Sequence, residues 1–239
     1  MNFITAQWSA PNNVKALTTT IQGGVSVGPY ASNNLALHVG DNPAHALQNR
    51  ERLRAKLNLL HEPAWLEQTH SSVCVTVEET TVRQADAAIT RVVAQPLVIL
   101  TGDCLPILLC NTQGSEIAAV HAGWQGLACG VIEQTLGQMQ SPADELCAWI
   151  GPSICQDCYE ISDAIKSRFL ERYPYSISAF RQRYANLAKI AELILSSHHV
   201  PAVFHAQICT FEQINACYSY RRNKQTGRMA SLIYLNNPG

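Results

Sequence analysis

The sequence predicts an α/β protein, a fold class in which helices pack against a sheet. Apolar and β-branched runs in the middle of the chain predict buried strands over residues 97–101, 106–110, 117–121 and 147–150. Apolar residues at helical spacing lie between and after these runs, at about 126–139 and 184–196. We therefore expect a three-layer α/β domain with a mixed central sheet.

The other elements follow from local patterns. Apolar residues at helical spacing predict a helix over 46–57, and alternating β-branched residues predict a strand over 73–77. Ser162 is expected to cap a helix, because serine is a favoured N-cap residue. Two further apolar runs, over 203–209 and 229–235, are predicted to close the chain as strands.

Length and composition indicate one globular unit. The chain has 239 residues, of which 47% are hydrophobic, and no repeat, low-complexity tract or linker divides it. We expect a single domain over residues 1–239. The net charge is −1 and no basic block stands out, so we expect no binding to nucleic acid or to an anionic membrane.

Targeting features and cysteine content favour the cytoplasm. The N-terminus lacks the basic and apolar regions of a signal peptide, and no apolar run is long enough to span a bilayer. The nine cysteines are an odd number, which fits free thiols better than a disulfide framework. Cys74, Cys110 and Cys147 lie in apolar surroundings, as buried free cysteines commonly do.

Reactive side chains follow two of the predicted strands. Cys104 comes just after the strand at 97–101, and His121 ends the strand at 117–121. Strand ends are where α/β proteins place ligand-binding and catalytic groups. Gly123 follows His121, and a glycine there lets the backbone approach a ligand closely. His70 ends another short segment and is a third candidate.

Two kinds of chemistry are open to these residues. One thiolate and two imidazoles make a ligand set for a d-block cation. The same cysteine and histidine also suit a nucleophile and its general base. Asp103 adjoins Cys104 and is predicted either to act in acid–base catalysis or to hold a metal-ligating histidine.

Two further patterns carry a weaker signal. Cys155 and Cys158 form a CxxC motif without a partner motif, which predicts neither a thioredoxin-like nor a zinc-knuckle role. Arg221 and Arg222 lie near two more cations, Lys224 and Arg228. Such a cluster is more often a solvated turn than an anion site, although it would fit at a sheet end beside a pocket.

The chain resembles a known family over nearly its full length, on motifs spread from end to end. In order, these motifs lie at residues 23–26, 34–35, 38–41, 49–50, 68–70, 85–87, 103–106, 121–124, 151–154, 159–160, 219–222 and 226–228. The family is that of the laccase-domain proteins. Its members were first labelled multicopper polyphenol oxidases and later described as purine nucleoside phosphorylases, and they include a bacterial peptidoglycan-editing factor.

The resemblance implies a function and a site. It implies a three-layer α/β/α fold, with phosphorolysis of adenosine, inosine and methylthioadenosine, and deamination of adenosine. It also implies a metal held by His70, Cys104 and His121, with zinc as the usual occupant and copper as a claimed one. The partners would be a purine nucleoside and phosphate. The candidate substrate-binding residues are Asn34, Arg50 and Gly123, with Arg50 the candidate for phosphate.

Two departures from the family pattern concern phosphate. Gln125 and Ile21 stand where the family commonly has arginine, the natural bidentate partner of phosphate. We expect these differences to affect phosphorolysis more than metal binding. Other hypotheses stay open: a copper phenol oxidase, a metal-free Cys/His amidohydrolase acting on peptidoglycan precursors, and a binding protein with a structural metal. The sequence does not predict the oligomeric state.

Overall fold

The computed structural model describes residues 1–236, in which the main strands form two sheets. The first sheet consists, in spatial order, of β1 (Phe3–Thr5), β2 (Val14–Thr19), β13 (Met229–Leu235), β6 (Leu97–Thr101) and β3 (Ala64–Trp65). The second consists of β12 (Ala202–His205), β9 (Leu146–Ile150), β7 (Leu105–Asn111), β8 (Ile117–Ala122), β5 (Ala87–Thr90) and β4 (Cys74–Thr76). Both sheets combine parallel and antiparallel pairs.

Five helices accompany the sheets in this part of the chain. They are α1 (Pro43–Lys56), α2 (Trp124–Cys129), α3 (Val131–Gln138), α4 (Asp163–Arg172) and α5 (Leu187–Ser197). A small hairpin, β10 (Phe180–Arg181) and β11 (Tyr184–Ala185), precedes α5. Within residues 1–236, no helix has both the length and the apolar character needed to cross a membrane.

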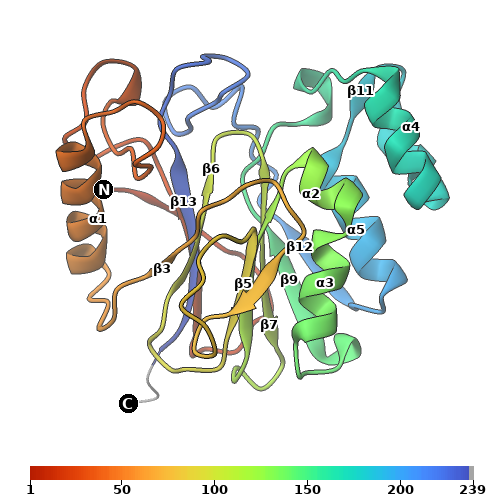
Figure 1. The fold of residues 1–239 in the computed structure, drawn as a ribbon, viewed down its shortest axis with the longest axis horizontal. Coiled ribbons are helices and arrows are strands. Elements are labelled where there is room, and N and C mark those ends of the chain that lie inside the picture. The colour runs from red at the N-terminus through yellow and green to blue at the C-terminus, as the bar shows by residue number, and fades with distance from the viewer. Residues whose placement is uncertain (237–239) are drawn as a thin grey trace.

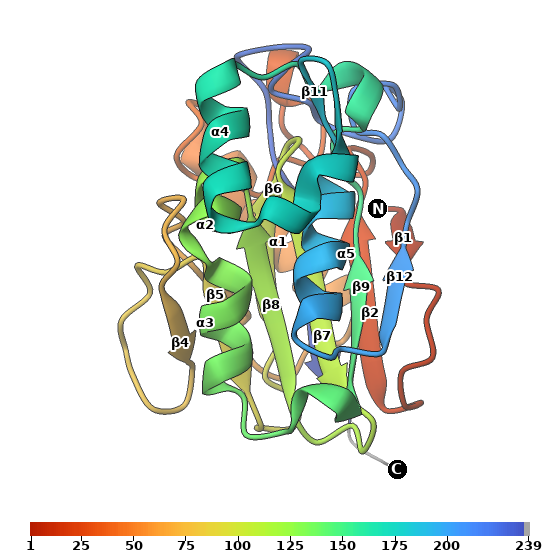
Figure 2. The ribbon, with the colours of Figure 1, turned by 90° about the vertical axis from the view of Figure 1, so that its right-hand side faces the viewer.

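The elements stack in layers, with a core between each pair. Figure 1 shows α1 on one side of the strands and α2, α3 and α5 on the other. In Figure 2, α2, α3 and α5 lie in front of the second sheet. Ile99 and Ile233 of the first sheet pack with Leu108 and Trp149 of the second in one hydrophobic cluster. Burying these side chains between two sheets removes a large apolar area from water, which is the main stabilising contribution to such a fold.

The α/β class and the mixed strand directions are therefore confirmed, and the structure refines the predicted layering. Instead of one central sheet between helices, two sheets pack face to face, giving four layers. The runs at 97–101 and 106–110 follow one another in the chain but belong to different sheets. Continuous apolar runs predict strands buried on both faces, and a second sheet covers a face as well as a helix does.

Local signals account for the differences at element ends. The helix expected over 126–139 is divided into α2 and α3 by Gly130, whose φ of 88° is left-handed and which caps both pieces. The helix expected over 184–196 begins at Leu187, because Asn186 caps it by accepting a hydrogen bond from the Lys189 N–H. Ser162 caps α4 as predicted.

Candidate active site

Strand pairing brings the three predicted ligands together. Cys104 directly precedes β7, and His121 lies near the end of β8, where its register partner on β7 is Pro106. His70 reaches the same place from the loop between β3 and β4. One ligand atom from each of the three lies within 4.8 Å of the others. We call these three residues the Cys/His site.

The buried carboxylate of Asp86 organises two of these ligands. It accepts hydrogen bonds from the backbone N–H groups of Thr69 (3.1 Å), His70 (3.0 Å) and Ser71 (2.7 Å). It also accepts the Ser71 hydroxyl at 2.7 Å and lies 2.7 Å from Nδ1 of His121. The loop that carries His70 is therefore wrapped around one anion, and His70 itself takes a left-handed φ of 61°. Strained backbone of this kind concentrates at functional sites.

The hydrogen bond to Asp86 also decides which histidine nitrogen is free. In the neutral imidazole, an acceptor at Nδ1 keeps the His121 proton there, so Nε2 is the nitrogen whose lone pair can bind a metal. Nε2 of His70 lies 3.8 Å from Sγ of Cys104. Gly123 leaves room for both groups, because an added Cβ there would lie 3.0 Å from Cδ2 of His70 and 3.1 Å from Sγ of Cys104. A glycine at this position thus permits the close grouping.

The charges of the site reinforce one another. Burial opposes ionisation of Asp86, but hydrogen bonds from His121 and Ser71 outweigh it and lower the pKa to about 2. Burial likewise opposes charge on Cys104, but the neighbouring His121 outweighs it and lowers the thiol pKa to about 6. Burial would lower the pKa of His121, yet Cys104 and Asp86 raise it to about 9. Cys104 is therefore ready to act as a thiolate, the form that binds metals and attacks electrophiles.

The Cys/His site opens into a cavity of roughly 510 Å³. This volume is in the range of small-molecule sites. Three cations contribute to its lining, namely Arg221, Lys224 and Arg228, and we call them the cationic lining. Three aromatic side chains, Trp124, Tyr159 and Tyr220, line it as well. The cavity thus combines metal-type ligands, positive charge and flat apolar surfaces.

Aromatic rings hold the cations in place. The Arg221 guanidinium lies 5.0 Å from the ring centre of Tyr159. Lys224 and Arg228 lie 4.6 and 5.7 Å from the ring of Tyr220. A cation within about 6 Å of a ring centre is attracted to the ring face, which favours these positions of the three side chains. The sequence leaves two interpretations of the basic cluster open, a solvated turn and a place at a sheet end beside a pocket. Three of its four residues line the cavity, which agrees with the second interpretation.

Arg222, the fourth member, has a different role. Its guanidinium donates to the backbone carbonyls of Thr210, Phe211 and Cys217. These bonds help to hold the loop that follows β12 by satisfying carbonyl groups of its backbone.

Of the two roles suggested for Asp103, holding a metal-ligating histidine is wrong, and acid–base catalysis stays a prediction. Its carboxylate accepts hydrogen bonds from the Thr210 hydroxyl (2.6 Å), the Ser219 hydroxyl (3.1 Å) and the Arg221 N–H (2.6 Å). Asp103 lines the cavity, but it anchors the loop that carries the cationic lining. The task of holding His121 belongs to Asp86.

Two of the predicted substrate contacts also lie elsewhere. Asn34 is fully buried, and its amide oxygen accepts from the N–H groups of Ala36 and Arg228 while its NH₂ donates to Ala36 and Asp41. All of its hydrogen-bonding capacity is used within the protein. Arg50 stacks 3.7 Å from the ring centre of Trp65 and does not line the cavity. Asn34 thus positions Arg228, and Arg50 packs on the α1 side of the fold.

Two residues without a predicted role lie at the Cys/His site or in the cavity lining. Asp86 is one, and His38, which lines the cavity, is another. Burial lowers the pKa of His38, and the charges of Arg228 and Arg50 lower it further, so its imidazole is neutral at physiological pH. Both residues belong to motifs noted in the sequence, at 38–41 and 85–87, but no local pattern gave either a partner.

Comparison with known proteins identifies the family. The family model described as multi-copper polyphenol oxidoreductase laccase matches residues 15–236. The chain belongs to this family. Purine nucleoside phosphorylase PA4543 of Pseudomonas aeruginosa is 38% identical over 98% of this chain and 99% of its own length. Purine nucleoside phosphorylase YfiH of Escherichia coli K12 is 39% identical, over 97% and 98% respectively.

A solved structure has the same fold. The crystal structure of Neisseria meningitidis protein NMB0706 superimposes with a TM-score of 0.94 at 40% identity, covering 99% of this chain and 100% of that one. The two curated relatives named above are both called purine nucleoside phosphorylases.

The two departures from the family's arginines differ in their effect. In this member of the laccase-like family Gln125 lines the cavity, so the positive charge of an arginine is absent from the lining at this position. Ile21 instead packs beside Cys217, Tyr218 and Met229 in a small apolar cluster and does not line the cavity. The expectation of a weakened anion site therefore rests on Gln125 alone, and the cationic lining supplies other positive charge.

Proposed function

We propose that this protein is a zinc-dependent purine nucleoside phosphorylase. Its substrates would be adenosine, inosine and methylthioadenosine, and it would also deaminate adenosine. One observation carries the proposal: the Cys/His site and the cationic lining share one cavity of nucleoside size. The names of relatives that match nearly the whole chain support the same substrate class.

The donor set fits zinc. Two imidazole nitrogens and one thiolate are borderline-to-soft ligands, and three protein ligands leave a fourth position open, as in catalytic zinc sites. The bond from His121 to Asp86 is the outer-shell contact that zinc-bound histidines usually have. Copper suits the same donors and remains the alternative occupant. Bound zinc would supply a Lewis acid that makes a nearby water more acidic.

The chain's own side chains would hold the two substrates. The cationic lining would bind phosphate, with arginine forks matching its oxygens and Lys224 adding a point charge. Trp124 and Tyr220 offer flat faces to a purine ring. Burial, with the nearby Cys104, raises the pKa of Tyr159 to about 12, so its hydroxyl stays a hydrogen-bond donor.

Phosphorolysis then requires mainly positioning and charge. A phosphate oxygen forms a bond to C1′ of the ribose while the C1′–N9 bond breaks. The electron pair of that bond leaves with the base, which takes up a proton, and ribose 1-phosphate is the other product. Holding the phosphate against C1′ converts a bimolecular step into one within a complex. The neutral imidazole of His38 is suited to hydrogen-bond a purine without adding charge.

Deamination would use the same cavity without phosphate. A water oxygen forms a bond to C6 of adenosine, and the bond from C6 to the exocyclic amino group breaks. One water proton leaves with that group as ammonia, and the other stays on the purine ring of inosine. His121 would stay oriented by Asp86 throughout, so the geometry of the site would not need to reorganise.

Product analysis tests the proposal. Zinc-loaded protein is incubated with adenosine or inosine, with and without phosphate, and the products are resolved by mass spectrometry. Free base and ribose 1-phosphate that appear only with phosphate are expected, and Cys104→Ala should abolish them. Cys129→Ser, a change at a thiol outside the cavity, is the control. Inosine from adenosine without base release would leave only the deaminase, and absence of all products would overturn the proposal.

A metal-free thiol hydrolase is the second candidate, and one arrangement favours it. Cys104, His121 and Asp86 are ordered as a nucleophile, a base and the residue that orients the base. An amide substrate such as a peptidoglycan precursor would then be attacked by the thiolate. Stoichiometric alkylation of Cys104 that stops activity in metal-free protein would favour this candidate. Protection of the thiol by tightly bound zinc would exclude it.

The oxidase named in the family description has less support. Oxygen reduction by a multi-copper enzyme requires several coppers held mainly by histidines. Among residues 1–236, the Cys/His site is the one candidate metal cluster with any histidine, and it has two. We therefore do not propose phenol oxidation.

A further inference from the structure

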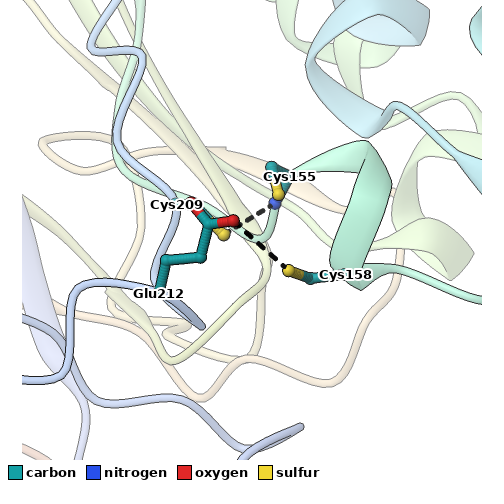
Figure 3. Close-up of side chains that lie close together, drawn as sticks. All are labelled: Cys155, Cys158, Cys209 and Glu212. Carbon is teal, nitrogen blue, oxygen red and sulfur yellow. Dashed lines mark hydrogen bonds between the residues drawn. The ribbon is translucent and has the colours of Figure 1, made fainter.

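A second cluster of metal-ligating side chains lies outside the cavity. Cys155, Cys158, Cys209 and Glu212 each offer one ligand atom, and these atoms all lie within 4.8 Å of one another. Figure 3 shows the four side chains gathered between two loops. Cys155 and Cys158 lie in the loop after β9, and Cys209 and Glu212 lie in the segment after β12. We call these four residues the thiol cluster.

The two loops meet in register at the thiol cluster. Ser153 and Cys209 form an isolated parallel β-bridge, which continues the pairing of β9 with β12. The Cys155 N–H donates to Sγ of Cys209 at 3.3 Å, and the Cys158 thiol donates to Glu212 at 3.9 Å. Each loop contributes two ligands three residues apart, a spacing typical of zinc ligands.

We propose that the thiol cluster is a structural zinc site. Three sulfurs and one carboxylate oxygen provide four protein ligands, the number that closes a tetrahedral zinc site. No position would be left for a substrate, so this site would differ in kind from the Cys/His site. The backbone N–H that points at the Cys209 sulfur is a partner that stabilises a thiolate. A cavity of about 410 Å³ beside the cluster gives the ion a path from solvent.

Charge repulsion is the reason why the thiol cluster would need a cation. Its three sulfurs lie close to one another and to the Glu212 carboxylate, so ionised thiolates here would repel each other and that carboxylate. A divalent cation supplies the positive charge that lets neighbouring thiolates form together.

The location indicates what the ion would do. Thr210 adjoins Cys209 and donates a hydrogen bond to Asp103, and the Ile154 N–H donates to the Asp103 carbonyl. The two loops joined by the thiol cluster are therefore also the loops that hold the start of β7. An ion here would link the two loops at this end of the cavity without contacting substrate. It would therefore stabilise the folded protein rather than take part in catalysis.

Metal analysis in a background without the first site tests the proposal. In Cys104→Ala protein, we expect one tightly bound zinc per chain, and none after Cys158→Ser and Cys209→Ser are added. Glu212→Gln changes an exposed residue, so the fold should be retained, and zinc affinity should fall at least about tenfold. Cys129→Ser is the matched control and should keep the zinc.

Cobalt substitution gives a spectroscopic reading of the ligands. Cobalt bound to Cys104→Ala protein should show a strong thiolate charge-transfer band and the visible bands of a tetrahedral ion. Both should be absent when Cys158 and Cys209 are serine. A chelator should lower the melting temperature of the Cys104→Ala protein but not that of the triple variant.

Two results would overturn the structural zinc site. One is Cys104→Ala protein that binds no zinc or cobalt when reduced and refolded with the metal. The other is a disulfide between thiols of the cluster in protein isolated under reducing conditions, detected as a mass loss of two hydrogens. Neither result depends on catalytic activity, so the proposed nucleoside chemistry is tested separately.

Discussion

Replacing Asp86 with asparagine removes the charge around which the Cys/His site is arranged. The carboxylate accepts N–H groups on both oxygens, so an NH₂ group in either position faces a donor from Thr69, His70 or Ser71. His121 could then turn its proton to Nε2 to accept from the amide, and Nε2 would no longer bind a metal. The variant therefore damages both the His70 loop and the orientation of His121.

The size of the effect follows from the pKa of Asp86. Burial opposes its ionisation, but the bonds from His121 and Ser71 lower the pKa from 3.8 to about 2. This shift corresponds to roughly 2 kcal/mol of folding free energy. Because the folded pKa is depressed, this stability is present above pH 3.8 and is lost as the pH falls toward 2. Asp86→Asn should lose about 2 kcal/mol at neutral pH.

Metal affinity gives the more specific reading. Loss of a partner that orients a ligating histidine typically costs about 10–100-fold in affinity or activity. We expect a decrease of this size in zinc affinity, measured by competition with a chromophoric chelator, with urea unfolding as the stability assay. Asp144→Asn, at an exposed position, is the matched control and should change neither. Folded Asp86→Asn protein with wild-type zinc affinity and activity would refute the reasoning.

Three further substitutions test separate parts of the cavity. Gly123→Ala should lower zinc affinity, because the added Cβ would crowd His70 and Cys104. Gly137→Ala is the control, because an added Cβ there meets nothing within 4 Å. It should keep the zinc affinity and stabilise its helix by roughly 0.5–1 kcal/mol. Chelator competition and thermal unfolding compare the two, and equal affinities would count against the packing argument. Lys224→Ala should raise the KM for phosphate several-fold without changing adenosine deamination, whereas Lys56→Ala should change neither. Gln125→Arg should lower the KM for phosphate, and an unchanged value would show that this position does not meet the anion.

Much of the fold could be predicted because its signals are local. The strand at 229–235 has the predicted bounds, since its sequence is a largely apolar run. The division of α2 from α3 at Gly130 was missed, because an isolated glycine inside a helical pattern is often tolerated. The separation into two sheets could not be predicted, because strands covered by a helix or by another sheet have the same apolar pattern.

The reactive residues of the candidate site could be predicted from the sequence, but the residues that hold them in position could not. His70, Cys104 and His121 were singled out by their types and their places at segment ends, and the structure groups them. His121 is oriented by a hydrogen bond to Asp86, which lies 35 residues earlier in the chain. Asp103, the chain neighbour of Cys104, instead accepts a hydrogen bond from a loop more than 100 residues later. Such long-range hydrogen bonds leave no periodic pattern. The single-domain organisation and the cytoplasmic location stay predictions.

The most direct test is a crystal structure of zinc-loaded protein with inorganic phosphate, using anomalous scattering at the zinc edge. We expect a zinc peak bonded to the Cys/His site, with phosphate density against the cationic lining in the same cavity. We also expect a second zinc peak at the thiol cluster. A Cys/His site without zinc at saturating metal, or phosphate bound only outside the cavity, would show that this pocket does not join a metal site to a phosphate site.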